Sequence, residues 1–127
     1  MTTKKVVYDI VLVMPIQDDI SSPGAFMLKE SYDNLKEALA KFKELAKEPG
    51  RGEKGFILEK ATLAHETIER IAIIDYEYKG YKTLNEFFDK RTKIIKDYID
   101  DKITYDEFRD EQLKNMPTLK INKKYLK

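Results

Sequence analysis

Residues 50–55 read Gly-Arg-Gly-Glu-Lys-Gly and match the G-x-G-x-x-G pattern of loops that bind nucleotide phosphates. In a dinucleotide-binding fingerprint a strand precedes the pattern and a helix follows it, because the helix N-terminus receives the pyrophosphate. Here the periodicity places a helix before the pattern and a strand after it. A P-loop needs Lys and then Ser or Thr after its last glycine, and Phe56 and Ile57 stand there. The motif therefore predicts a flexible helix-to-strand turn, and no cofactor is expected.

The chain has no cysteine and a single histidine, His65. This excludes disulfides, thiolate zinc sites, cysteine nucleophiles and metal sites that take two imidazoles from one chain. His65 has the chemistry of a general base, but the sequence places it in a solvated turn beside Glu66, with no nucleophile at an informative spacing. The adjacent pairs Asp18-Asp19 and Asp100-Asp101 fit turns and caps. No catalytic or metal site is predicted, and a hydrolase with carboxylates that converge on folding is the least favoured alternative.

Two groups of residues indicate binding instead. Three tyrosines cluster at the end of a predicted strand, where sheet packing or a partner-facing patch would explain them. Residues 114–127 hold five lysines and no acidic residue. This basic segment has three interpretations: it lies back on acidic residues of its own chain or a second copy, it is solvated, or it contacts phosphates. The candidate partner-binding residues are Tyr76, Tyr78, Tyr81, Lys120, Lys123, Lys124, Tyr125 and Lys127.

Apolar periodicity and turn residues predict the elements that position these side chains. Apolar residues three and four apart predict a helix from Leu35 to Ala46, with Ser31 as its N-cap. Thr83 opens a second helix, and Thr104 opens a short third one with a capping box. The predicted strands cover residues 5–14, 56–63, 67–78 and 118–122, with a turn at 64–66 and an extension or edge strand at 25–28.

The predicted fold class is α+β, in the order β-α-β-β-α-(α)-β. A two-layer sandwich closes this order most simply, with a ferredoxin-like arrangement as the leading hypothesis and the two longer helices on one sheet face. If residues 118–122 are coil, the prediction reduces to a general α+β fold. We expect one domain over residues 1–117, followed at 118–127 by a last short strand or a basic tail.

Two resemblances accompany these patterns. Ile103-Thr104-x-x-Glu107-Phe108 lies within residues 95–115, which resemble the short C-terminal helical hairpin called SHOCT. In this chain Asp101-Lys102 replace the turn glycine of that module. The resemblance implies a local helix-turn-helix and no activity. In size and in its bias toward Lys, Ile, Tyr and Asn, the chain is similar to small phage-type accessory or early proteins.

The chain has 127 residues and a net charge of +1, which is a length typical of one domain and gives no overall electrostatic case for nucleic acid. No apolar run is long enough to span a membrane, and the cytoplasm is the expected compartment, that of the host if the gene belongs to a phage. We predict a small non-enzymatic protein that binds other proteins, possible partners being host or phage proteins whose process it modulates. The alternative is a weak, sequence-independent nucleic-acid binder that uses the C-terminal lysines. A homodimer is compatible with either function.

Overall fold

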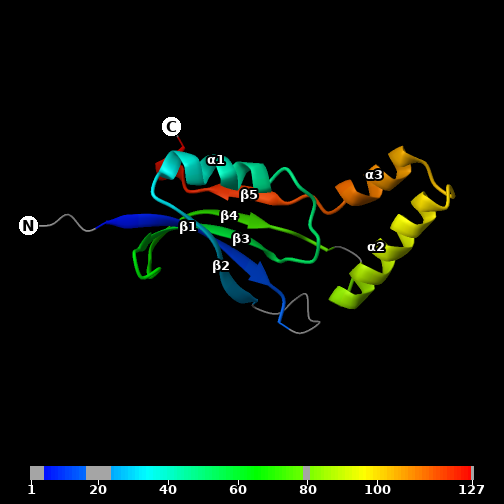
Figure 1. Cartoon of the computed structure of the whole chain (residues 1–127), viewed down its shortest axis with the longest axis horizontal. Helices are drawn as coiled ribbons and strands as arrows, with labels where there is room; N and C mark the ends of the chain where they lie inside the picture. Colours follow the sequence, from blue (N-terminus) through cyan, green and yellow to red (C-terminus); the bar gives the residue numbers. More distant parts are fainter. Residues whose placement is uncertain (1–4, 17–23, 79–80, 127) are drawn as a thin grey trace, which may run out of the picture.

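In the residues that the computed structural model describes, the chain forms a five-stranded antiparallel sheet and three α-helices (Figure 1). Residues 5–16, 24–78 and 81–126 are described. The strands are β1 (Val6–Met14), β2 (Ala25–Tyr32), β3 (Gly55–Thr62), β4 (Thr67–Asp75) and β5 (Thr118–Ile121). The helices are α1 (Leu35–Leu45), α2 (Leu84–Ile99) and α3 (Tyr105–Leu113), and a 3-10 turn, η1, covers Lys123–Tyr125. The α+β class is therefore confirmed.

The order of the elements differs from the predicted one, because β2 is a full strand and not a short extension. The sheet order is β2-β1-β3-β4-β5, and all neighbours are antiparallel. Strands β2 and β3 flank β1 on its two sides, and α1 connects them across it. This order does not confirm a ferredoxin-like arrangement. Residues Lys29–Tyr32 are polar or charged and escaped strand recognition because β2 is an edge strand with mostly exposed side chains.

The length of β2 also moves the start of α1. Ser31 was predicted as the N-cap, but it lies in β2 opposite Asp9 of β1. Asn34 caps the helix instead, and its side chain accepts hydrogen bonds from the backbone N–H groups of Lys36 and Glu37. An asparagine at this position satisfies N–H groups that have no partner within the helix. The helix consequently begins only after the strand has ended.

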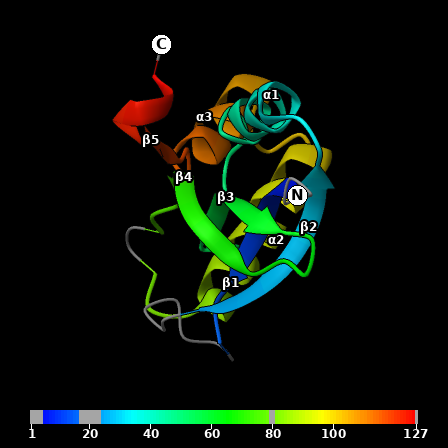
Figure 2. The ribbon, with the colours of Figure 1, turned by 90° about the vertical axis from the view of Figure 1, so that its left-hand side faces the viewer.

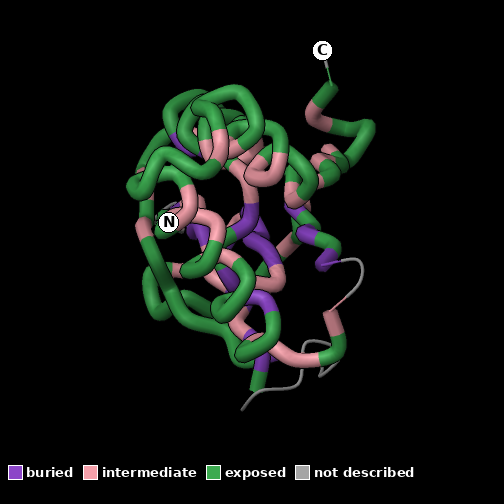
Figure 3. The backbone as a smooth tube through the Cα atoms, turned by 90° about the vertical axis from the view of Figure 1, so that its right-hand side faces the viewer, coloured by how far each residue is buried: buried purple, intermediate pink, exposed green. Residues whose placement is uncertain are grey.

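The hydrophobic core lies between α1 and one face of the sheet (Figure 2). Ala38 and Phe42 of α1 are fully buried, and they pack in one cluster with Ile10 and Leu58 from the central strands. Buried stretches follow the strands, whereas the outer turns of the helices are exposed (Figure 3). The apolar stripe that predicted α1 from the sequence is therefore the stripe that faces the sheet.

Of the two longer helices predicted to cover one sheet face, α1 does so and α2 does not; α2 and α3 form a V beyond one end of the strands (Figure 1). The strand β4 ends at Asp75, so the chain has left the sheet before α2 begins at Leu84. Within the V, the rings of Tyr98 and Phe108 stack with their centroids 4.8 Å apart. Asp101 has a φ of 60°, the left-handed conformation that a glycine adopts at this place in many helical turns.

The last strand, β5, pairs with β4 over four residues, so residues 118–121 are part of the sheet. The capping box predicted at Thr104 and Glu107 is present at the start of α3. The hairpin turn predicted between β3 and β4 is present as well, and its His65 has a φ of 65°. Among the described helices none is long and apolar enough to cross a membrane.

Candidate functional site

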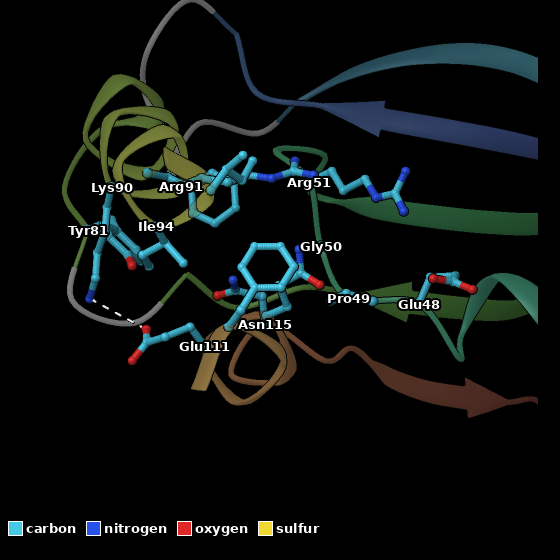
Figure 4. A pocket seen from close by; sticks show the side chains of 14 residues that line it. Glu48, Pro49, Gly50, Arg51, Tyr81, Lys90, Arg91, Ile94, Glu111 and Asn115 are labelled. Atoms are coloured by element: carbon cyan, nitrogen blue, oxygen red, sulfur yellow. Dashed lines mark ion pairs between the residues drawn. The ribbon is translucent and has the colours of Figure 1, made fainter. Parts of the chain in front are cut away.

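The best-formed hollow in the described part of the molecule lies between the V of α2 and α3 and the loop that follows α1 (Figure 4). Its cavity volume is about 100 Å³. The floor is apolar and aromatic, and Arg51, Lys90 and Arg91 bring positive charge to it. The lining residues are Glu48, Pro49, Gly50, Arg51, Tyr81, Phe87, Lys90, Arg91, Ile94, Ile95, Phe108, Glu111, Gln112 and Asn115. We call this hollow the hairpin pocket.

The glycine motif forms one wall of the hairpin pocket, and its backbone N–H groups are used inside the protein. The N–H of Gly50 donates to the carbonyl of Asn115 at 2.8 Å, which ties the loop to the end of α3. The N–H of Arg51 donates to the Glu53 carboxylate at 2.7 Å. The N–H of Gly52 donates to the hydroxyl of Tyr78 at 2.9 Å. Since these three N–H groups donate within the protein, the loop does not present them to a phosphate, and the turn predicted as flexible is held by hydrogen bonds at these residues.

Two of the three tyrosines predicted to bind a partner are instead buried against the inner side of this loop. Tyr76 and Tyr78 are buried, and both lie against Gly50, where an added Cβ would come within 2.6 Å of the Tyr78 hydroxyl. That hydroxyl donates to the carbonyl of Glu53 at 2.6 Å. Burial raises the pKa of Tyr78, and it raises the pKa of Tyr76 to about 12. The sheet-packing interpretation therefore describes these two residues.

Tyr81 is the member of the tyrosine group that lines the hairpin pocket. Its ring meets the ring of Phe87 edge to face, with the centroids 5.5 Å apart. The ammonium of Lys90 lies 5.6 Å from the centre of the Tyr81 ring, in the range of a cation–π interaction. Tyr81 thus holds one cation of the pocket in place and is itself half-buried.

The charges of the hairpin pocket are only partly balanced. Glu111 lies 2.6 Å from the Lys114 ammonium and 4.0 Å from the Lys90 ammonium. The hydrogen bond from Lys114 holds the pKa of the Glu111 carboxyl below its usual value, so this carboxyl stays ionised. Over the described ranges, no carboxylate lies within ion-pair distance of the Arg51 or the Arg91 side chain. Arg91 therefore remains available to an anionic group at the hollow, whereas the Arg51 side chain extends away from the hollow toward Glu48 (Figure 4).

The described lysines of the predicted C-terminal group lie in β5 and η1, at the edge of the sheet opposite β2. Lys124 forms an ion pair with Glu69 of β4 at 3.1 Å, and the Tyr125 hydroxyl donates to the same carboxylate at 2.8 Å. These hydrogen bonds lower the pKa of Glu69. Lys120 and Lys123 are exposed, and Lys127 lies outside the described residues. Part of the basic segment is therefore folded back on an acidic residue of its own chain.

A second group of polar residues, which the sequence did not connect, meets on the other face of the sheet. Asp9 is 2% exposed, and its carboxylate accepts a hydrogen bond from the Ser31 hydroxyl at 2.6 Å. Its other oxygen lies 2.9 Å from Nδ1 of His65. We call these three residues the Asp9 cluster.

The Asp9 cluster has the residue types of a hydrolytic triad in a different order. In a triad the histidine lies between the acid and the serine, so that it takes the serine proton. Here Asp9 lies between Ser31 and His65, and the serine hydroxyl donates its hydrogen bond to the Asp9 carboxylate. No described side chain lies at a hydrogen-bonding distance from Nε2 of His65, and neither hollow found among the described residues includes it. The geometry therefore stabilises a buried carboxylate and activates no nucleophile.

The sequence pattern pointed to Tyr81 among the residues of the hairpin pocket and missed its arginines. Arg51 lies in the glycine motif, which was interpreted as a helix-to-strand turn and not as a binding element. Arg91 lies within the apolar stripe of α2, four residues from both Phe87 and Ile95, and it was not singled out from the sequence. A signal existed in principle, because two of the four arginines of a lysine-rich chain lie in this pocket.

In comparisons with protein-family models, with curated proteins and with solved structures, nothing matched this chain.

Proposed function

We propose that the protein is a non-enzymatic binding module whose hairpin pocket receives an apolar side chain of a partner protein, flanked by acidic residues. The observation that carries the proposal is the pairing of an aromatic floor with Arg91, which has no acidic partner in the described chain. Arginine and aromatic residues are enriched where protein interfaces gain most of their binding energy. An acidic flank would complete the charge balance of the pocket.

The shape of the pocket supports a segment of protein as the ligand. A cavity of about 100 Å³ is smaller than typical sites for whole cofactors, which are on the order of 300–1,000 Å³. It suits one large side chain, and the rim with the exposed Lys90 and the half-buried Arg91 suits the residues that flank it. Because the loop N–H groups are used internally, the anion would meet the Arg91 guanidinium group, and such groups bind carboxylates in a bidentate manner.

A displayed library of random peptides tests the proposal even though the partner is unidentified. We expect selection on the folded protein to enrich peptides that combine a bulky apolar residue with neighbouring Asp or Glu. The Arg91→Ala variant should bind a selected peptide about tenfold more weakly, which corresponds to roughly 1.4 kcal/mol. Arg109→Ala is the matched control, since Arg109 is an exposed arginine of α3 that does not line the pocket.

Two outcomes would contradict the proposal. One is a selection that converges on no shared pattern in repeated rounds. The other is a set of peptides whose affinity is the same for the Arg91→Ala and Arg109→Ala variants. Affinities are measured by fluorescence anisotropy at two salt concentrations, because a charge-dependent contact weakens as salt screens it.

The nucleic-acid alternative has weaker support. Tyr125 is half-buried with its hydroxyl bound to Glu69, and Lys124 is paired with the same carboxylate, so neither is free for a nucleic acid. Lys120 and Lys123 remain as exposed cations. These two lysines of the described segment would neutralise few phosphates, so their contribution to binding would be weak and strongly reduced by salt. Retention on single-stranded DNA at low salt, compared with a Lys120→Ala/Lys123→Ala variant, tests this alternative.

The similarity to phage accessory proteins stays a prediction, and so does the likeness of α2–α3 to the SHOCT hairpin. If the first holds, the partner belongs to the host or to the phage itself. Screening the selected peptide pattern against the proteins of both would then narrow the choice of partner.

A further inference from the structure

The outer edge of β2 is the most exposed apolar part of the described sheet. In the strand order β2 lies at one end, next to β1 alone (Figure 1). Three consecutive large apolar side chains on it are exposed: Phe26 is 61% exposed, Met27 57% and Leu28 48%. An edge strand of this kind presents unpaired backbone N–H and C=O groups together with apolar side chains. Only another extended strand satisfies both.

The register of β1 and β2 assigns these side chains to the two faces of the sheet. Phe26 pairs with Val13 and Leu28 with Val11, so both lie on the face opposite α1. Met27 pairs with Leu12 and lies on the α1 side. The pairing register shifts after Leu28, so that Lys29 has no partner in β1. The regular part of the edge is therefore the stretch Ala25–Leu28.

We propose that this edge pairs with the same edge of a second copy of the chain, antiparallel and around a two-fold axis at Met27. The axis places Met27 opposite Met27 of the second copy. It places Phe26 opposite Leu28 of the second copy, and the reverse pair forms by symmetry. Every directly opposed pair in the centre is then apolar, and the two sheets join into one continuous sheet.

Charge disfavours the registers with an axis at Leu28 or Lys29. An axis at Lys29 would place two lysines directly opposite each other, and like charges in this position are destabilising. An axis at Leu28 would place Phe26 opposite Glu30 and Met27 opposite Lys29, and each pair would join an apolar side chain to a charge. The axis at Met27 instead places Lys29 opposite Ala25, where its ammonium reaches solvent. An axis at Phe26 would also oppose apolar residues, but it would pair only residues 25–27, because β2 begins at Ala25, whereas the axis at Met27 pairs residues 25–29.

Disulfide trapping tests the register, and the absence of native cysteine makes each introduced thiol unique. Directly opposed residues of antiparallel strands have Cα atoms about 4.5–5.5 Å apart, within disulfide range. We expect Met27→Cys to form a covalent dimer on mild oxidation. Ala25→Cys alone and Lys29→Cys alone should not, because equivalent atoms would be roughly 13 Å apart. A mixture of these two variants should cross-link, because the register places residue 25 opposite residue 29.

Solution mass tests the interface without introduced thiols. Light scattering coupled to size exclusion should show a dimer that dissociates on dilution between about 1 mM and 1 µM, as expected for an interface of modest size. Leu28→Lys should shift the mass to the monomer at every concentration. Ile99→Lys is the matched control, since Ile99 is 71% exposed at the end of α2, far along the chain from the edge. Circular dichroism of each variant establishes that it is folded.

Each outcome decides the proposal. A monomer of the native chain at all concentrations overturns it, and so does a dimer that Leu28→Lys leaves intact. Stronger cross-linking of Lys29→Cys than of Met27→Cys overturns the register. The proposal is independent of the hairpin pocket, because peptide binding there involves α2, α3 and residues 48–51, none of which lies at the β2 edge.

Discussion

The Asp9 cluster and the hairpin pocket both hold charged groups against apolar surroundings, and they do so with opposite results. At the sheet, the carboxylate of Asp9 is buried and bound by Ser31 and His65. At the pocket, Arg91 lines an apolar hollow without an acidic partner in the described chain. No described buried side-chain nitrogen or oxygen lacks a hydrogen-bond partner. A charge that is satisfied internally stabilises a fold, whereas a charge left open at a hollow is available for binding.

Removal of the buried carboxylate should give the largest effect on stability. Asp9→Ala deletes two hydrogen bonds to a charged group and leaves a small cavity on β1. We expect the free energy of unfolding to fall by about 2–4 kcal/mol, measured by urea denaturation. Asp33→Ala, which removes an exposed carboxylate paired with Lys5, should cost less than about 0.5 kcal/mol. Equal losses in the two variants would remove the distinction between a satisfied buried charge and a surface one.

The next largest effect on stability is expected from the Tyr78 hydroxyl, which holds the glycine loop beside the hairpin pocket. Tyr78→Phe removes a donor to the Glu53 carbonyl and an acceptor for the Gly52 N–H, both of which hold the glycine loop. Loss of about 1–2 kcal/mol in the free energy of unfolding is expected, because the Gly52 N–H is left without its partner. The selected peptide should also bind more weakly, since the loop forms one wall of the pocket. Unchanged peptide affinity in this variant would show that the loop does not shape the pocket.

Alkaline pH should lower the stability of the protein through Tyr76, the second buried tyrosine beside the glycine loop. The pKa of Tyr76 is about 12 in the folded protein, above its ordinary value of 10.0, because burial disfavours the phenolate. The stabilising difference is complete below pH 10 and is lost as the pH rises toward 12, since the unfolded chain releases its proton first. The loss is expected to be about 1 kcal/mol at pH 11 for this residue. Unfolding followed at pH 8 and pH 11 measures it, and Tyr76→Phe should reduce the loss between these two pH values by about this amount.

The pocket arginines should separate binding from stability. Arg91→Ala removes a side chain that has no ion-pair partner among the described residues, so the free energy of unfolding should change by less than about 0.5 kcal/mol. Thermal unfolding checks this expectation beside the peptide titration. A large loss of stability with unchanged peptide binding would invert the comparison and make Arg91 a structural residue.

The smallest effect is expected at the C-terminal segment. Glu69→Gln weakens the contacts to Tyr125 and Lys124 that hold η1 against β4. Hydrogen exchange at residues 122–126 should become faster, while the thermal midpoint stays within the error of measurement, because the carboxylate is exposed to screening. In the unmodified protein the same loosening should appear as the pH falls through the lowered pKa of Glu69. Unaltered exchange in the variant would show that strand pairing alone holds the segment.

Local signals predicted most elements. The stripe of α1, the capping box at Thr104 and the hairpin around residues 64–66 depend on neighbours in the chain, and all three are present. The full length of β2 was missed, because an edge strand with exposed polar residues lacks the alternation that a buried strand shows. The position of α2 was missed too, since amphipathicity predicts a buried face without naming the element that buries it.

The residues of the candidate site were likewise predicted only in part. The three tyrosines were recognised as a group, but the sequence treats them alike, whereas the fold buries Tyr76 and Tyr78 and places Tyr81 at the pocket. The Asp9 cluster joins residues 22 and 56 positions apart. Such contacts depend on strand register, and register emerges only when the strands have paired.

Composition, periodicity and capping residues were thus enough to establish the α+β class, the absence of thiol chemistry and the places where most helices and strands begin and end, because these properties depend on short stretches of chain. Only the tertiary structure decided which side chains meet: that Asp9 is held by Ser31 and His65, that the glycine loop uses its own N–H groups, and that Arg91 lines the hairpin pocket. The physical reason is that burial and charge balance are properties of packed elements, and the same residue is a core support or a contact surface according to what the fold places beside it.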